Sequence, residues 1–317
     1  MLGSGAVFAR LLSLATAAAL RARGLRHETL EIGEWRLRVH RGGRPGGEPW
    51  LLLHGLGATA ATYLPLISHL RDDCELVLPE LSELGGSRGP RAAPSVPESA
   101  RLVEALVERC FPDRPPTLAG ISLGGWIAVR ALLDRPGLAE RLLLVVPGGW
   151  RDQDWTRIGS MVRVESLAET EAVWRALFVD PPWWIRPGRY GLFLAYRSAA
   201  VREILGCVRE QDAFGREELG RLELPVGLIW GERDDLFRVG VGEQMAAALP
   251  RARLEVVPEA AHAVQWERPE AFVAAVERFR RGFPLPRPPG ERKIGPGKDP
   301  GGHRGDRPWP RPTTSSA

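Results

Sequence analysis

Gly120-Ile121-Ser122-Leu123-Gly124 fits the pattern G-x-S-x-G, and it lies where a short apolar run, residues 117–121, meets a helix-like run, residues 123–133. A serine at so sharp a turn takes a strained backbone, and a glycine on each side lets strand and helix pass closely. The pattern alone is short enough to arise by chance, so its surroundings decide its meaning. We interpret Ser122 as a candidate nucleophile.

Short runs rich in leucine and β-branched residues lie on both sides of this turn, with helix-like patterns between most of them. Strands that are apolar on both faces and separated by helices predict a mostly parallel sheet covered on both sides, so we expect an α/β fold. The predicted strands are residues 35–40, 50–53, 75–78, 117–121, 141–146, 226–230 and 254–257. Residues 97–110 and 269–279 carry the clearest helical spacing.

The alternation stops once, in residues 150–222. This stretch lacks a convincing strand and holds five tryptophans. It therefore predicts a helical insertion rather than another strand–helix unit.

The base for a nucleophilic serine must be histidine, because lysine is missing from the folded part. The 43 basic residues are 41 Arg and two Lys, and both lysines lie beyond residue 292. Schiff-base enzymes, Ser-Lys dyads and phosphate-loop hydrolases are thereby excluded. Of the six histidines, His262 follows the last predicted strand in a loop, which is where a general base belongs. For His27, His40, His69 and His303 a surface or packing role is favoured.

The carboxylate that orients this histidine should follow a neighbouring strand. Residues 231–235, Gly-Glu-Arg-Asp-Asp, leave the next-to-last predicted strand. We choose Asp234 for this role, with Asp235 as the alternative. The chain order Ser, Asp, His is one of three known for such a triad.

An anion that develops on a carbonyl oxygen needs backbone N–H donors. Leu123 N–H, directly after the serine, is one candidate, and Leu56 N–H in the turn His54-Gly55-Leu56-Gly57 is the other. Residues 55–60 also fit the dinucleotide fingerprint G-x-G-x-x-A, with Glu80 as a ribose ligand. That alternative, an oxidoreductase, leaves the serine and histidine unexplained.

The charge of +4 belongs to the two ends of the chain. Residues 27–283 hold 32 basic and 36 acidic side chains, so nucleic-acid binding has no support there. The three cysteines are widely spaced and contain no CxxC pair, which argues against disulfides and a structural zinc site. We interpret them as buried apolar residues in a reducing compartment.

The two ends of the chain differ in composition. Residues 1–26 are apolar and basic, and a helix packed on the body or lying at a membrane interface is the favoured interpretation, with a signal peptide or spanning helix as alternatives. Residues 284–317, rich in Pro and Gly, predict a disordered tail. We expect a cytoplasmic protein, which is associated with a membrane if residues 1–26 bind one. Export of the protein is the alternative.

Five blocks together resemble the serine hydrolases of the α/β-hydrolase fold, most of all bacterial esterases and monoacylglycerol-lipase-like members. The blocks have the family's order and spacing over about residues 27–283. One departure is Glu80 with Gly85-Gly86, where the family more often has Asp and a single spaced glycine. The blocks are HGLG (54–57), PELSELGGSRG (79–89), GISLGG (120–125), GERD (231–234) and AAHAVQWERP (260–269).

The resemblance implies an α/β-hydrolase fold with a helical cap inserted after the sixth core strand. It implies an esterase that works through an acyl-enzyme, with Ser122 as nucleophile, His262 as base and then acid, and Asp234 orienting the imidazole. Serine at the turn argues against the dehalogenases and epoxide hydrolases of this fold, whose nucleophile is a carboxylate. No cofactor or metal is expected, and the partner is a small ester.

The cap would set substrate choice, and we expect aromatic rings in it to line an apolar pocket. A carbon–carbon bond hydrolase or a perhydrolase would use the same triad, and a non-catalytic scaffold is a further alternative. The candidate pocket residues are Trp150, Trp155, Trp183 and Trp184. The expected segments are an N-terminal helix (1–26), core (27–149), cap (150–222), core (223–283) and tail (284–317).

Overall fold

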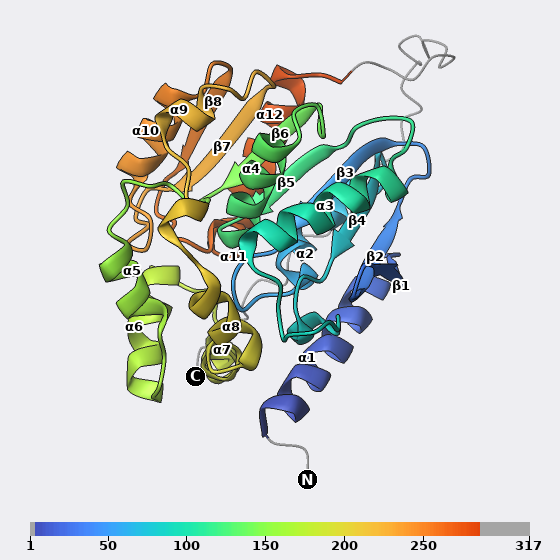
Figure 1. Cartoon of the computed structure of the whole chain (residues 1–317). Coiled ribbons are helices and arrows are strands. Elements are labelled where there is room, and N and C mark those ends of the chain that lie inside the picture. Colours follow the sequence, from blue (N-terminus) through green and yellow to red (C-terminus); the bar gives the residue numbers. More distant parts are fainter. Residues whose placement is uncertain (1–3, 286–317) are drawn as a thin grey trace, which may run out of the picture. The chain divides into compact units, whose positions relative to one another are not determined.

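In the computed structural model, which describes residues 4–285, the fold is built on one mixed sheet of eight strands (Figure 1). The strands lie side by side in the order β1-β2-β4-β3-β5-β6-β7-β8. β3 to β8 are mutually parallel, and β2 joins them antiparallel to β4. The strands are β1 (Arg26–Ile32), β2 (Trp35–Gly43), β3 (Glu48–Leu53), β4 (Cys74–Pro79), β5 (Thr117–Ile121), β6 (Arg141–Val145), β7 (Val226–Gly231) and β8 (Ala252–Val257).

The central strands are buried along their whole length. Every residue of β5, β6 and β7 is buried. A strand covered by helices on both faces has no solvent side, and its sequence is therefore continuously apolar rather than alternating. The predicted parallel α/β sheet is confirmed.

Helices cover both faces of the sheet (Figure 1). α3 and α4 pack against each other on one face, and α2 and α12 pack against each other on the other. α3 begins at a capping box, in which Ser95 and Glu98 each bond the other's backbone N–H. The covering helices are α2 (Leu64–Leu70), α3 (Val96–Cys110), α4 (Leu123–Asp134), α10 (Val239–Ala248) and α12 (Pro269–Gly282).

The first strand was not predicted from the sequence. β1 forms a hairpin with β2, and Gly33, with φ 57°, is the first of its two turn residues. Only Leu30 in β1 is buried, because the strand lies at the edge of the sheet. Its apolar alternation is correspondingly weak. His27, which precedes the first predicted strand (residues 35–40), lies in β1 opposite His40.

Helices occupy the chain between β6 and β7, as expected for a cap after the sixth strand. Among the described residues of this stretch there is no strand, apart from one isolated bridge between Trp150 and Phe214. The predicted helical insertion is confirmed. Its helices are α5 (Trp155–Val162), α6 (Leu167–Leu177), α7 (Arg189–Tyr196), α8 (Ala199–Cys207) and α9 (Arg216–Leu219).

The N-terminal segment forms helix α1 (Ser4–Arg21). Gly24, with φ 89°, ends it in a left-handed turn, and Leu25 N–H donates to the Leu20 carbonyl at 3.1 Å. Leu20 and Leu25 are both fully buried, which completes a Schellman-type helix end. The end of α1 is therefore fixed to the body by packing.

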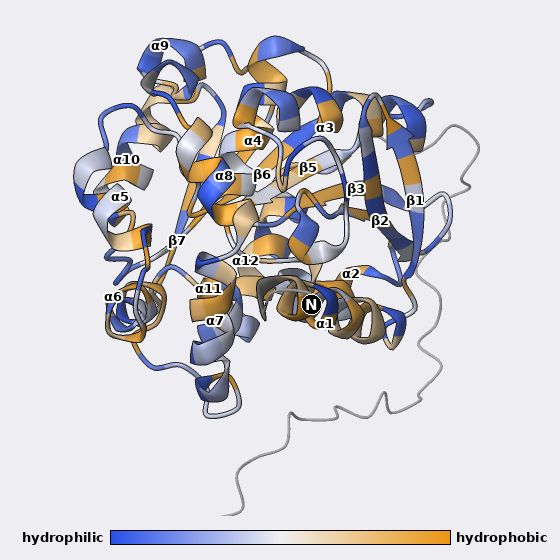
Figure 2. Ribbon diagram, turned by 60° about the horizontal axis from the view of Figure 1, so that its bottom comes forward, coloured by the Kyte–Doolittle hydropathy of each residue, from blue (hydrophilic) through white to orange (hydrophobic). Residues whose placement is uncertain are grey.

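α1 buries polar side chains on one face and exposes apolar side chains on the other. The buried positions include the polar Ser13 and Thr16, whereas Val7, Leu11 and Leu14 are exposed. These three residues are spaced by four and three, so they form one row on the helix, which we call the α1 stripe. Figure 2 shows hydrophobic colour along α1 and places α7 beside it.

None of the helices in residues 4–285 is long and apolar enough to cross a membrane. The predicted tail, residues 284–317, lies outside the described residues except for its first two positions.

Candidate active site

Ser122 lies in the turn between β5 and α4. Its φ of 53° and ψ of −115° belong to a backbone region that residues with a side chain rarely adopt. Ser122 N–H donates to the Val145 carbonyl at 2.9 Å, and the Ser122 carbonyl accepts from Gly148 N–H at 3.0 Å. Neighbouring backbone therefore holds the strained turn in place.

The glycines on either side of Ser122 are required by close backbone packing. A Cβ atom at Gly120 would lie 2.3 Å from the Gly124 carbonyl oxygen. A Cβ atom at Gly124 would lie 2.2 Å from the Leu53 carbonyl oxygen at the end of β3. Any side chain at either position would push the strand and helix apart, which explains the spacing of the motif.

His262 and Asp234 come from the loops after β8 and β7, and their side chains meet. His262 Nδ1 lies 2.8 Å from Asp234 Oδ2, and both residues are buried. The other carboxylate oxygen, Oδ1, accepts the N–H groups of Leu236 and Phe237, each at 2.8 Å. Because an ionised carboxylate only accepts, His262 carries its hydrogen on Nδ1, and its Nε2 is the basic atom.

The neighbouring carboxylate, Asp235, is placed differently. Its side chain is exposed, and its carbonyl accepts from the Arg157 guanidinium at 2.8 Å. The ring of Phe237 packs edge-on against the His262 ring, with centroids 5.1 Å apart. Of the two candidate carboxylates, the structure thus brings Asp234 to the histidine.

The loop that carries His262 is tied to the cap by Glu267. This buried carboxylate accepts the N–H of Ala261 at 2.6 Å, and the N–H groups of Val179 and Asp180 at 2.7 and 2.8 Å. We did not single out Glu267 in the sequence. The signal that could have found it is an acidic residue five positions after His262 and just before a helix that begins with Pro.

The turn after β3 lies directly against the serine. A Cβ atom at Gly55 would lie 3.3 Å from the Ser122 Cβ. Leu56 in this turn and Leu123 at the start of α4 line the same cavity as Ser122. The N–H of Leu123 is in the first turn of a helix, where N–H groups have no intrahelical acceptor. The assignment of these two N–H groups to an oxyanion remains a prediction.

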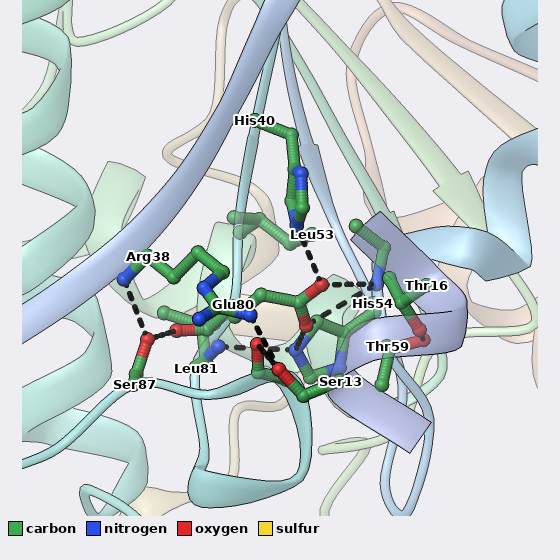
Figure 3. A network of polar contacts seen from close by, with 12 residues as sticks. Ser13, Thr16, Arg38, His40, Leu53, His54, Thr59, Glu80, Leu81 and Ser87 are labelled. Atoms are coloured by element: carbon green, nitrogen blue, oxygen red, sulfur yellow. Dashed lines mark hydrogen bonds and ion pairs between the residues drawn. The ribbon is translucent and has the colours of Figure 1, made fainter. Parts of the chain in front are cut away.

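His54 stabilises this turn through hydrogen bonds of its imidazole to backbone atoms (Figure 3). Leu81 N–H donates to His54 Nε2 at 3.0 Å, so Nε2 is the accepting nitrogen. The hydrogen is therefore on Nδ1, which lies 2.9 Å from the Gly55 carbonyl oxygen. A neutral imidazole with both nitrogens occupied thus holds the backbone next to Leu56.

Glu80 is the carboxylate at the centre of the same network (Figure 3). It is fully buried; Oε1 lies 3.1 Å from His40 Nε2, and it accepts the N–H of Ala60 at 3.2 Å. A ribose ligand must face an open site, whereas these contacts turn Glu80 inward. The dinucleotide interpretation of residues 55–60 therefore loses its acidic ligand.

A cavity of about 710 Å³ opens onto Ser122 and His262. Its lining is mostly apolar and comes from the core, the cap and α1. Burial raises the pKa of Tyr196 in this lining to about 12, so its hydroxyl stays protonated at neutral pH. Such a cavity suits a small molecule with an apolar part.

Only Trp155 of the four predicted pocket tryptophans lines the cavity. Trp150 is a correction: its ring is buried in the core, and its indole N–H donates to Gln244 Oε1 at 3.1 Å. Trp183 is a second correction, since 67% of it is exposed. Trp184 is 41% exposed and packs edge-on against Trp266, with centroids 5.7 Å apart.

Three other tryptophans line the cavity, and we did not predict them. Trp126 comes from α4, Trp174 from α6 and Trp266 from the short helix α11 (Val264–Glu267), which follows His262. Trp126 packs against Trp155, with ring centroids 5.1 Å apart. The helical register of Trp126, four residues after Ser122, is the signal that could have found it.

The cysteines do not compete with Ser122 as nucleophiles. Burial raises the pKa of Cys74 to about 12, and it also raises the pKa of Cys110. A thiol that stays protonated is a poor nucleophile. Cys207 is half-buried, not fully buried as expected. Within residues 4–285, no group of three or more His, Cys, Asp and Glu side chains is arranged to hold a metal ion.

A strained serine after one parallel strand, with an imidazole and a buried carboxylate after two others, defines the α/β-hydrolase class of protein. The chain belongs to this family, because the sequence model of the family described as "Alpha/beta hydrolase family" matches residues 50–275.

Relatives and solved structures agree with this assignment. The chain is 28% identical to a pimeloyl-[acyl-carrier protein] methyl ester esterase of Chromobacterium violaceum, over 73% of this chain and 93% of the relative. It is 24% identical to monoacylglycerol lipase ABHD6 of Mus musculus, over 75% and 77%. The structure of a bacterial membrane phospholipase A superposes with a TM-score of 0.75 at 25% identity, covering 87% of this chain and 92% of the other.

Proposed function

We propose that the protein is a serine hydrolase that cleaves carboxylic esters with an apolar acyl group. The observation that carries the proposal is the hydrogen-bonded pair His262–Asp234, of which His262 lines the same apolar cavity as the strained Ser122. The esterase and lipase names of relatives support the ester bond as the target.

The proposed reaction assigns one step to each of these groups. Ser122 Oγ adds to the ester carbonyl carbon while His262 Nε2 takes its proton, and Asp234 stabilises the imidazolium that forms. The carbonyl oxygen becomes an anion, which the N–H groups of Leu56 and Leu123 stabilise by about 2.7–4 kcal/mol per donor. The C–O bond then breaks, and the alcohol leaves with the proton from His262.

The second half of the reaction repeats these roles with water. His262 takes a proton from water, the hydroxide oxygen adds to the acyl-enzyme, and Ser122 leaves with that proton. The free carboxylic acid is the second product. Every proton and bond is supplied by substrate, water and three side chains, so the proposal requires no cofactor or metal.

Labelling by a fluorophosphonate probe tests the proposal. The probe should modify wild-type protein at Ser122 and leave Ser122→Ala unmodified. Equal labelling of the variant would refute a nucleophilic Ser122, and absence of labelling in the wild type would do so as well and would favour the non-catalytic scaffold.

Turnover assays distinguish the remaining alternatives. A carbon–carbon bond hydrolase or a perhydrolase would also be labelled at Ser122, because it would use the same triad. p-Nitrophenyl esters, a vinylogous 1,5-diketone and acetic acid with peroxide should therefore be compared on one preparation. Faster cleavage of the diketone, or faster peracid formation, would replace ester hydrolysis as the main activity. A nicotinamide fluorescence titration tests the oxidoreductase alternative.

We further propose that the protein acts at an anionic membrane surface through the α1 stripe, Val7, Leu11 and Leu14. The stripe supports this because it is exposed, and because the first 26 residues carry four Arg and no acidic residue. Leu11→Asp with Leu14→Asp should reduce co-sedimentation with phosphatidylglycerol vesicles by about tenfold or more. Equal sedimentation of wild type and double variant would remove this part of the proposal.

The segment boundaries also remain a proposal. We place the substrate-selecting cap at residues 150–222 and the two parts of the core at 27–149 and 223–283. Limited proteolysis tests the assignment, and first cuts within the core strands rather than in the linking loops would contradict it.

A further inference from the structure

The cavity at Ser122 has a wall that comes from α1. Phe8 and Leu12, two half-buried residues of α1, line the cavity together with Ser122 and His262. The family match begins only at residue 50, so α1 lies outside the matched region. One wall of the cavity therefore comes from outside the region that the family model matches.

Phe8 and Leu12 lie close to the proposed reaction centre as well as to the cap. They pack in one apolar cluster with Leu56 and Leu123, whose N–H groups we assign to the oxyanion. Ala195 and Ile204 of α7 and α8 belong to the same cluster. Phe8 and Leu12 are one helical turn apart, so they present one continuous apolar surface to the cavity.

Buried polar contacts hold α1 in this position (Figure 3). Ser13 Oγ donates to the Gly85 carbonyl at 3.0 Å and also accepts from the Arg38 guanidinium. Thr16 Oγ1 lies 2.8 Å from Thr59 Oγ1, and both hydroxyls are buried. A rotation or slip of α1 would leave these buried hydroxyls without partners, which is costly. The contacts therefore set which side chains of α1 face the cavity.

The attachment point of α1 is also next to the proposed oxyanion turn. Thr59 directly precedes Ala60, whose N–H donates to Glu80. Thr59 follows Leu56 by three residues. The helix is thus anchored to the same short segment that shapes the reaction centre.

We propose that α1 is part of the substrate site, and that Phe8 and Leu12 limit the length of the apolar chain that the cavity accepts. The proposal rests on ester hydrolysis at Ser122 as proposed above. A chain that reaches this wall gains roughly fourfold in binding for each additional methylene it buries. The gain stops where the chain meets Phe8 or Leu12.

Leu12→Trp tests the wall by making it thicker. With p-nitrophenyl esters from acetate to dodecanoate, kcat/KM for the decanoate should fall about tenfold more than kcat/KM for the acetate. Phe8→Ala should shift the preferred chain length upward. Butyrate esters of alcohols from methanol to decanol test the other side of the ester bond in the same way.

Ala15→Trp is the matched control, because Ala15 is exposed on the same helix and receives the same indole. Its chain-length profile should equal that of the wild type. A shift of the Leu12→Trp profile in either ester series supports the proposal. A Leu12→Trp profile that matches Ala15→Trp in both series overturns it.

Two further measurements separate this proposal from the proposed function. Fluorophosphonate labelling reports whether each variant is folded and reactive, and Leu12→Phe replaces Leu12→Trp if the latter is not labelled. Stabilisation of Ser122→Ala by decanoate in thermal unfolding requires no turnover. Leu12→Trp in that background should reduce the shift in Tm by at least half. An unchanged shift would contradict the proposal that Leu12 limits the bound chain, even in a protein that hydrolyses no ester.

Discussion

The Glu80 carboxylate occupies the space in which a side chain at Gly85 would lie. A Cβ atom at Gly85 would lie 2.0 Å from Glu80 Oε2. The family resemblance left one departure unexplained: Glu where Asp is more usual, followed by an additional glycine. The two changes are one adaptation, because the longer side chain of Glu80 extends into the volume that a side chain at residue 85 would need.

This relationship predicts coupled effects on stability. Gly85→Ala should lower the free energy of unfolding by about 1–3 kcal/mol, because the new methyl group overlaps a buried carboxylate. In a Glu80→Asp background the same substitution should cost less, with a coupling energy above about 0.5 kcal/mol. Urea unfolding at equilibrium measures all four proteins, and equal costs of Gly85→Ala in the two backgrounds would contradict the explanation.

Ser122 and His262 should act as a unit. Ser122→Ala and His262→Ala are each expected to lower kcat for an ester by about 10⁴ or more, and the double variant should lose little beyond either single one. Each residue is useless to the reaction without the other, which is the reason for the non-additivity. Steady-state kinetics with a p-nitrophenyl ester are the measurement, and losses that multiply would count against a triad.

The two neighbouring carboxylates should differ sharply. Asp234→Asn is expected to lower kcat by about 10³–10⁴, because an amide at this position no longer holds the hydrogen on His262 Nδ1. Asp235 is exposed, and Asp235→Asn should leave kcat within about a factor of three. A larger loss from Asp235→Asn than from Asp234→Asn would reverse the assignment.

The cysteines should react at different rates with iodoacetamide. Burial raises the pKa of Cys74 to about 12, so the thiol is neutral at ordinary pH, and the thiolate fraction at pH 8 is on the order of 10⁻⁴. Half-buried Cys207 should therefore be alkylated at least about tenfold faster, as measured by peptide mass spectrometry. Denatured protein, in which both sites should react alike, is the control, and faster labelling of Cys74 in the native state would contradict its burial.

The sheet and the position of the serine could be predicted because the signals are local. β5 and the start of α4 follow from an apolar run and a glycine-flanked serine within eight residues. The loops of Asp234 and His262 follow from the rule that parallel strands end at one edge of the sheet. That rule does not say which of two adjacent carboxylates turns inward; backbone donors at Leu236 and Phe237 decide that in the structure.

The cavity lining could not be predicted in the same way. Trp150 and Trp183 both lie between β6 and β7, yet one is buried in the core and the other is mostly exposed. Their surroundings depend on how the cap helices pack, and the amphipathic spacing of short helices does not specify this. The contribution of Phe8 is a further example, since its partners in the cavity other than Leu12 are more than forty residues away in the chain.

The position of α1 ahead of the sheet and the cap also affects how the fold is assembled during synthesis. α1 leaves the ribosome before the other described elements, and Leu84 and Ala195, against which its inner face packs, follow about 70 and 180 residues later. At 5–20 residues per second, the last of these partners emerges roughly 10–40 s after the helix. During that interval the apolar side chains of α1 lack the packing partner that the cap provides. One wall of the cavity can therefore form only after the cap has been synthesised.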